Sequence, residues 1–256
     1  MIRIHKLQIP DLPTKKPRRL YIYLPQNYSK TEQRYPVLYM FDGHNVFYDS
    51  HATYGKSWGM KEYLKRTKLP LIIAAIECNP EGDRRMNEYA PWDYDVPEYG
   101  FMEGLGKVTM DWISGPLKQM IDENYRTLPE RENTLIGGSS MGGLMSLYAI
   151  TAYNHIFSGA AALSPSFFFG GAHLHELISR TQLENPTRIY MDLGTGEFEP
   201  EQRKIPAELF ETAAELTLAG ADAAARVIPG AFHCEAAWEK RIPVFMDYLL
   251  KEEGSL

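Results

Sequence analysis

The stretch "LIGGSSMGG" (135–143) places two adjacent serines between two glycine pairs, directly after a short apolar run. The pattern Gly-x-Ser-x-Gly fits it in one register only, from Gly138 to Gly142, which centres it on Ser140. This pattern is typical of a sharp turn from a buried strand into a helix, in which flanking glycines permit close backbone approach and the central hydroxyl is exposed. We expect Ser140 to be a nucleophile and Ser139 to point away into the turn; a serine N-cap with a glycine-rich turn is the alternative.

The apolar runs around this stretch predict the fold. Short, nearly continuous runs, typical of strands buried on both faces, cover 35–43, 69–77, 133–138, 157–165 and 187–194, and a run with one polar face covers 19–25. Segments with helical periodicity cover 59–67, 111–125, 142–153, 207–220 and 234–253. Alternation of the two kinds predicts a single α/β domain over 1–256, with a mainly parallel central sheet, helices on both faces, antiparallel pairing at one edge and no large lid domain.

Composition excludes several classes of function. The chain has 256 residues, a net charge of −6 and scattered Lys and Arg residues, so nucleic acid is not an expected partner. No run approaches the roughly 18 apolar residues that a membrane span needs, and the first residues lack a signal-peptide pattern. Two cysteines are too few for a disulfide framework. We therefore expect a cytoplasmic protein.

A serine nucleophile needs a base that is itself oriented by a carboxylate, and in this kind of fold the acid and then the histidine follow the serine in the chain. His233 is the only histidine after residue 175, and it lies in a loop between an apolar run and an amphipathic segment. Glu197 follows the run that ends at Gly194 and is the favoured acid, with Glu199 second. Asp192 lies within the run, where strand alternation turns it away from the site.

Two backbone N–H groups are candidates for holding an oxyanion. Met141 follows the nucleophile at the start of a helix, and His44 follows the apolar run 35–43 in the sequence Asp42-Gly43-His44. Loops after an early strand commonly supply the second donor in such folds. A plain Asp-Gly turn is the alternative for this segment, and the ring of His44 could act on substrate instead.

Several stretches together resemble the esterase D-like, enterochelin esterase-related family of α/β-hydrolases. They are "YPVLYMFDGHNVF" (35–47), "SWGM" (57–60), "RRMNEYAPW" (84–92), "IDENYRTLPERENTLIGGSSMGGLMSLYA" (121–149), "ALSPSFFF" (162–169) and "GAFHCEAAW" (230–238). The resemblance implies the α/β-hydrolase fold, with Ser140 as nucleophile and His233 as base. Relatives often have Asp where this chain has Glu197, and some enterochelin esterases manage with a weakened or missing acid.

These observations predict a carboxylesterase that acts through an acyl-enzyme on acetyl or feruloyl esters of carbohydrates or on similar small esters. A siderophore trilactone esterase and an acyltransferase with the same triad are the alternatives. Trp58, Trp92 and Phe167 are the expected substrate contacts, since aromatic walls favour sugar or phenolic faces, although packing against the core is equally consistent with them. No cofactor or metal is expected, and association with further copies of the chain is left open.

Overall fold

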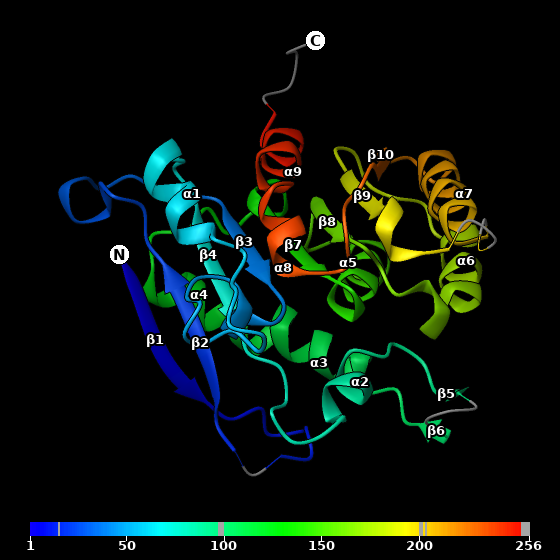
Figure 1. Ribbon diagram of the computed structural model, residues 1–256. Coiled ribbons are helices and arrows are strands. Elements are labelled where there is room, and N and C mark those ends of the chain that lie inside the picture. The colour runs from blue at the N-terminus through cyan, green and yellow to red at the C-terminus, as the bar shows by residue number, and fades with distance from the viewer. Residues whose placement is uncertain (15, 97–99, 200–201, 203, 252–256) are drawn as a thin grey trace.

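A sheet of eight strands in the order β1-β2-β4-β3-β7-β8-β9-β10 forms the centre of the protein (Figure 1). The computed structural model describes residues 1–14, 16–96, 100–199, 202 and 204–251. The strands of the sheet are β1 (Ile2–Leu7), β2 (Arg18–Tyr23), β3 (Val37–Met40), β4 (Ile72–Ile76), β7 (Thr134–Ser139), β8 (Gly159–Leu163), β9 (Arg188–Gly194) and β10 (Asp222–Ile228). Strands β4, β3, β7, β8, β9 and β10 are parallel, whereas β2 pairs antiparallel with both β1 and β4. The mainly parallel sheet and its antiparallel edge are thus confirmed.

Helices cover both faces of this sheet (Figure 1). They are α1 (Met60–Thr67), α2 (Arg84–Glu88), α3 (Gly106–Trp112), α4 (Lys118–Asn124), α5 (Met141–Ala152), α6 (Gly171–Ser179), α7 (Lys204–Leu218), α8 (Glu235–Glu239) and α9 (Ile242–Leu249). Strand β3 shows how the two faces arise: Val37 and Tyr39 belong to the apolar cluster that contains Leu144 of α5, and Leu38 and Met40 belong to the opposite one. Both faces of the inner parallel strands are therefore buried, as continuous apolar runs predict, whereas no residue of the edge strand β10 is buried.

Two predicted helices are interrupted, and proline explains both interruptions. The helix expected over 111–125 contains a π-helical turn, Ile113–Leu117, which includes Pro116 and joins α3 to α4. The helix expected over 234–253 is divided into α8 and α9, and Pro243 lies in the first turn of α9. Proline has no N–H, and its ring clashes with the carbonyl four residues earlier, so a regular helix cannot continue through it.

Strand β2 also differs from its prediction. Its run was expected to have one polar face, but five of its six residues are buried and the other is half-buried. The reason is that both faces of β2 pack on apolar clusters: Leu20 and Ile22 belong to one, and Tyr21 and Tyr23 belong to the other. Between β8 and β9 the chain adds only the nine-residue α6 and a short 3₁₀ turn, Phe167–Phe169, in agreement with an architecture without a large lid.

The segments that carry the predicted site residues all follow the carboxyl ends of parallel strands. Asp42 to Asn45 follow β3, Ser140 follows β7, Glu197 follows β9 and His233 follows β10. Because these strands are parallel, their carboxyl ends lie at the same edge of the sheet, where open α/β sheets bind ligands. Among the helices of the described residues, none has the length and apolar content that a membrane crossing would need.

A buried ion pair joins β2 to α2. The guanidinium of Arg18 donates to both carboxylate oxygens of Glu88, at 2.7 and 2.5 Å, and both side chains are 1% exposed. The amide of Asn79 donates a further hydrogen bond of 2.9 Å to Glu88. The two charges thus compensate each other away from water, although Nε of Arg18 has no hydrogen-bond partner.

We expect Glu88→Ala to lower the free energy of unfolding by about 3–5 kcal/mol, because it leaves the Arg18 charge buried without its partner. Urea unfolding measures the loss. Lys107→Ala is the matched control, since the Lys107–Asp111 pair has side chains 68% and 51% exposed and its removal should cost less than about 1 kcal/mol. Equal losses in the two variants would contradict the assignment of Glu88 as a buried partner.

Candidate active site

Ser140 lies in the turn between β7 and α5, with a backbone φ of 60° and ψ of −125°. Non-glycine residues rarely adopt this conformation, which occurs where surrounding structure imposes it. Close packing at the turn explains the glycine at 138, because a Cβ there would lie 2.9 Å from the backbone of Gly142. The Ser140 N–H donates to the carbonyl of Leu163 at the end of β8, at 2.9 Å. The predicted strand-to-helix turn is therefore present, with its second serine at the strained position.

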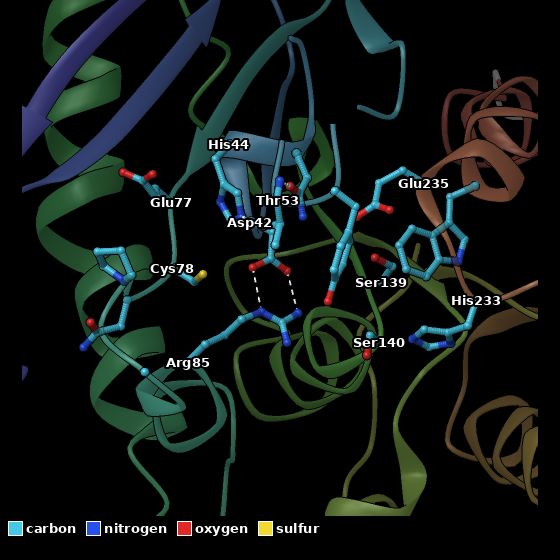
Figure 2. A pocket seen from close by; sticks show the side chains of 16 residues that line it. Asp42, His44, Thr53, Glu77, Cys78, Arg85, Ser139, Ser140, His233 and Glu235 are labelled. Atoms are coloured by element: carbon cyan, nitrogen blue, oxygen red, sulfur yellow. Dashed lines mark hydrogen bonds and ion pairs between the residues drawn. The ribbon is translucent and has the colours of Figure 1, made fainter. Parts of the chain in front are cut away.

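The hydroxyl group of Ser140 borders a cleft of about 550 Å³, which we call the Ser140 cleft (Figure 2). Its lining residues are Asp42, His44, Asn45, Thr53, Tyr54, Glu77, Cys78, Asn79, Pro80, Gly82, Arg85, Ser139, Ser140, His233, Glu235 and Trp238. Ser139 is buried yet borders the cleft too, which differs from the expectation that it points away from it. The hydroxyl oxygen of Ser140 lies 3.2 Å from that of Ser166.

His233 and Glu197 form a hydrogen-bonded pair beside this serine. Nδ1 of His233 lies 2.9 Å from a carboxylate oxygen of Glu197, and the imidazole is turned toward Ser140 across the cleft in Figure 2. The His233 side chain is 45% exposed, whereas that of Glu197 is 6% exposed. The bond at Nδ1 leaves the other ring nitrogen free to face the serine. Serine, histidine and glutamate from three strand ends thus converge on one place.

The second carboxylate oxygen of Glu197 is held by groups of the surrounding backbone and core. It accepts hydrogen bonds from the Ser164 hydroxyl and from the Gly194 N–H, each at 2.7 Å. Burial alone would raise the pKa of Glu197, but the hydrogen bonds from His233, Ser164 and Gly194 outweigh it and hold the pKa below its usual value. Glu197 therefore stays ionised and could stabilise a protonated imidazole.

Two residues of the C-terminal helices complete this buried network. The Ser164 hydroxyl accepts hydrogen bonds from the Trp238 indole N–H at 3.0 Å and from the Arg241 guanidinium at 3.1 Å. Arg241 also binds Asp192 at 2.8 Å and reaches Glu197 at 3.3 Å. Sequence reasoning did not identify Ser164, Trp238 or Arg241. Ser164 lay near the end of the predicted run 157–165, and in the structure it directly follows β8.

Asp192 is fully buried within β9 and faces Arg241 rather than His233. Its carboxylate accepts hydrogen bonds from Arg241 and from the Tyr190 hydroxyl, both at 2.8 Å. Burial raises the pKa of Asp192 to about 6, although Arg241 and Tyr190 oppose the shift. Strand alternation thus turns Asp192 away from the histidine, as the sequence predicted, and Glu197 is the carboxylate in contact with it.

The two candidate oxyanion donors belong to the start of α5 and to the turn after β3. Met141 is the first residue of α5, so its N–H has no acceptor within the helix. His44 lies in the 3₁₀ turn Gly43–Asn45, which packs so closely on β4 that a Cβ at Gly43 would lie 2.3 Å from the carbonyl oxygen of Ala75. The ring of His44 is hydrogen-bonded through Nε2 to Thr53, at 2.9 Å. A glycine is thus required in the turn that presents the His44 N–H.

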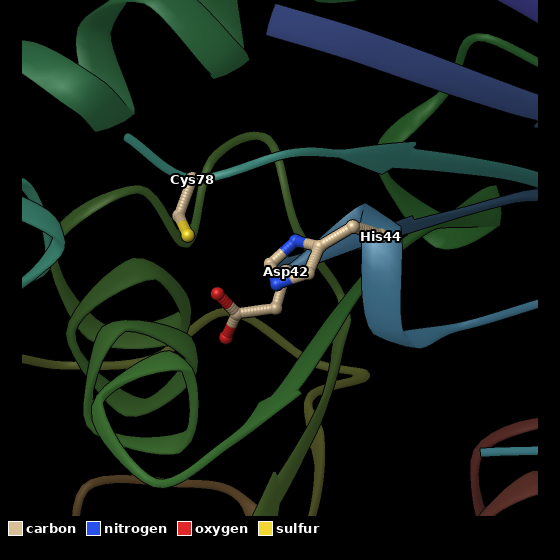
Figure 3. A group of neighbouring side chains, drawn as sticks. All are labelled: Asp42, His44 and Cys78. Carbon is tan, nitrogen blue, oxygen red and sulfur yellow. The ribbon is translucent and has the colours of Figure 1, made fainter. Parts of the chain in front are cut away.

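Asp42, His44 and Cys78 form a cluster of potential metal ligands whose donor atoms lie within 4.8 Å of one another (Figure 3). Both carboxylate oxygens of Asp42, however, bind the guanidinium of Arg85, at 2.8 and 2.7 Å. Burial would raise the pKa of Asp42, but Arg85 outweighs it and lowers the pKa. Burial raises the pKa of the Cys78 thiol well above its usual value, which keeps the sulfur protonated. These groups fit an ion pair with Arg85 better than a bound cation.

The three aromatic residues predicted to contact substrate lie outside the lining of the Ser140 cleft. Trp58 is 4% exposed and packs on Trp238, with ring centroids 5.8 Å apart. Phe167 is 5% exposed within the apolar core. Trp92 is half-buried and stacks on His173 at 5.4 Å. Trp58 instead packs behind the ring of Trp238. That ring contacts His233 edge-on, with the two ring centroids 5.1 Å apart.

The fold and the serine at the strained strand-to-helix turn define the class of α/β-hydrolase-like serine hydrolases. The chain belongs to the esterase family, whose model, described as "Putative esterase", matches residues 13–249. The protein YbbA of Bacillus subtilis is 29% identical over 184 residues, which are 70% of this chain and 69% of YbbA. The chain is therefore a serine esterase by family.

Solved structures of hydrolases share the fold. An IroE-like serine hydrolase from Shewanella oneidensis has a TM-score of 0.76 at 21% identity, over 97% of this chain and 79% of that one. The siderophore hydrolase EstA from Aspergillus nidulans has a TM-score of 0.76 at 17% identity, over 98% and 95% of the two chains. A ferulic acid esterase has a TM-score of 0.66 at 16% identity, over 97% and 96%. At these identities the likeness establishes the architecture alone.

The two neighbouring glutamates after β9 provide a test of the acid. We expect Glu197→Gln to lower kcat/KM for p-nitrophenyl acetate by about 10²–10⁴-fold, because glutamine cannot supply the charge that stabilises a protonated His233. Glu199→Gln is the control, since Glu199 is exposed, and should stay within about threefold of the unmodified protein. Steady-state kinetics measures both. A larger loss in the Glu199 variant would overturn the assignment.

Proposed function

We propose that this esterase hydrolyses carboxylic esters through an acyl-enzyme on Ser140, with His233 as general base and Glu197 as the acid that orients it. The observation that carries the proposal is the hydrogen bond of 2.9 Å between His233 and Glu197 beside a serine held in a strained turn. A serine hydroxyl is a weak nucleophile at neutral pH and requires such a pair. The order of these three residues in the chain, serine, then acid, then histidine, also supports the proposal.

The first half of the reaction forms the acyl-enzyme. The Nε2 atom of His233 takes the proton of Ser140 while the serine oxygen attacks the ester carbonyl carbon. The negative charge that develops on the carbonyl oxygen is held by the N–H groups of Met141 and His44, which need no reorganisation because they belong to fixed turns. The protonated His233 then gives its proton to the leaving alcohol, and the carbon–oxygen bond to that alcohol breaks.

Water completes the cycle. His233 removes a proton from a water molecule that attacks the acyl carbonyl, and the same two N–H groups hold the second oxyanion. Collapse of this intermediate returns the proton to Ser140 and releases the carboxylic acid. Glu197 remains ionised throughout, which its lowered pKa favours.

Acetyl or feruloyl esters of carbohydrates fit the Ser140 cleft best. Asn45, Thr53 and Asn79 line it with polar side chains, and Trp238 adds an aromatic face. Each of the three polar side chains already has a partner within the protein and keeps a further donor or acceptor position for a sugar hydroxyl. Its charged groups are largely neutralised: Arg85 binds Asp42 at 2.7 Å, and Arg19 binds Glu77 at 2.6 Å. A cleft with compensated charges favours a neutral substrate with many hydroxyl groups.

A siderophore esterase is the second candidate. Two of the similar solved structures, the IroE-like serine hydrolase and the siderophore hydrolase EstA, favour it. Ferric siderophores of the catecholate type are strongly anionic, however, and would call for free cations in the cleft. The lining cation among the described residues is Arg85, and both carboxylate oxygens of Asp42 already engage it. We therefore place carbohydrate esters first.

A substrate panel with the Ser140→Ala variant tests this function. We expect hydrolysis of p-nitrophenyl acetate and of acetylated or feruloylated xylo-oligosaccharides, with kcat lower by at least about 10³-fold in Ser140→Ala, because no other group can form the acyl-enzyme. Acid release measures the rates. Residual activity within tenfold of the unmodified protein would contradict the role of Ser140, and a preference for a ferric siderophore would select the second candidate.

A further inference from the structure

Glu235 is a buried acid in the Ser140 cleft that the proposed mechanism does not use. It is the first residue of α8, two positions after His233, and it is 5% exposed. Glu235 lines the Ser140 cleft, and Figure 2 shows its side chain extending from the side of His233, with the carboxyl group above Ser139 in this view. The carboxyl group therefore borders the volume that a substrate bound at Ser140 would occupy.

The other buried carboxylates of this region have clear partners, and Glu235 differs from them. Asp42 binds Arg85, Glu77 binds Arg19, and Glu197 binds His233 and Ser164. Within the described ranges, no other residue donates a hydrogen bond or forms an ion pair with the Glu235 carboxyl group. Burial raises the pKa of this group, the charge of Asp42 adds to the shift, and its own backbone N–H opposes it.

The Glu235 side chain is nearly buried, and its own backbone N–H is the one donor that bonds to its carboxyl group among the described residues. A carboxyl group can form several hydrogen bonds, so the remaining positions of this one are left to whatever occupies the cleft. A ligand that brings hydroxyl groups into the cleft fills these positions. Hydroxyls match the site better than ammonium groups do, since burial disfavours the charged carboxylate and a neutral carboxylic acid can both donate to and accept from a hydroxyl.

We propose that Glu235 binds a hydroxyl group next to the scissile ester and so makes the enzyme selective for esters of sugars and related polyols. This inference rests on the proposed function, because it assigns one part of that substrate site. The competing explanation is structural: an acidic residue in the first turn of a helix favours the helix through its dipole. The two explanations differ in whether the effect of a substitution depends on the substrate.

The experiment compares two esters that differ in their hydroxyl groups. Monoacetates of methyl β-xyloside carry hydroxyls beside the ester, whereas cyclohexyl acetate has a ring of the same size without them. We expect Glu235→Ala to lower kcat/KM for the xyloside acetates by about 10–100-fold, the range for a lost hydrogen bond to a buried polar group, and to leave cyclohexyl acetate within about threefold. Glu235→Gln should recover much of the loss, because an amide also donates and accepts.

Glu239→Ala is the matched control, because Glu239 lies on the same helix but is 41% exposed and pairs with Lys56. It should leave the ratio of the two substrates unchanged. An equal effect of Glu235→Ala on both esters, or no effect on either, would overturn the role of Glu235 while leaving the esterase function in place. If no ester is hydrolysed in a Ser140-dependent way by the unmodified protein, the proposed function fails, and the Glu235 assignment fails with it.

Discussion

The backbone conformation of Ser140 is the constraint on which the site depends. The conformation of a non-glycine residue at φ 60° and ψ −125° is unfavourable by on the order of 1–3 kcal/mol. The packing of the elements on either side must supply this free energy. Every residue of β7 is buried, and α5 is buried from Met141 to Thr151. This packing fixes the turn. The turn sets the direction of the Ser140 hydroxyl and the position of the Met141 N–H at the start of the helix.

Burial also holds the residues that position His233. His233, the proposed base, is about half-exposed, as a group that exchanges protons with substrate and water must be, whereas Glu197, the proposed acid, is 6% exposed and bound from three sides. The Ser164 hydroxyl connects that acid to Trp238 and Arg241. Since Trp238 also contacts the His233 ring, one network sets the position of both the acid and the base.

Much of the architecture could be predicted from the sequence because burial leaves a direct pattern. Continuous apolar runs identified the parallel strands, the glycine spacing identified Ser140, and chain order identified Glu197 and His233 as its candidate partners. The break before α9 was also visible in principle, because Pro243 cannot lie inside a regular helix. These features are local, so a single stretch of sequence carries each of them.

The remaining features depend on contacts that no local pattern encodes. Ser164 meets Trp238 and Arg241 across 74 and 77 positions of the chain, and neither helix shows in its sequence which polar residue faces inward. Trp58 illustrates the same problem for aromatic residues. The sequence around a tryptophan does not show whether its ring lines a cleft or packs behind the residues that do. The burial of the Glu235 side chain likewise depends on residues far away in the sequence and is seen only in the structure.

Labelling with a fluorophosphonate, which phosphonylates activated serines, tests the central claim most directly. The account predicts stoichiometric modification of Ser140, located by mass spectrometry of the digested protein, and strongly slowed labelling in His233→Ala, whose serine has lost its base. Modification of Ser139 in place of Ser140, or a folded protein that does not react at all, would contradict the account.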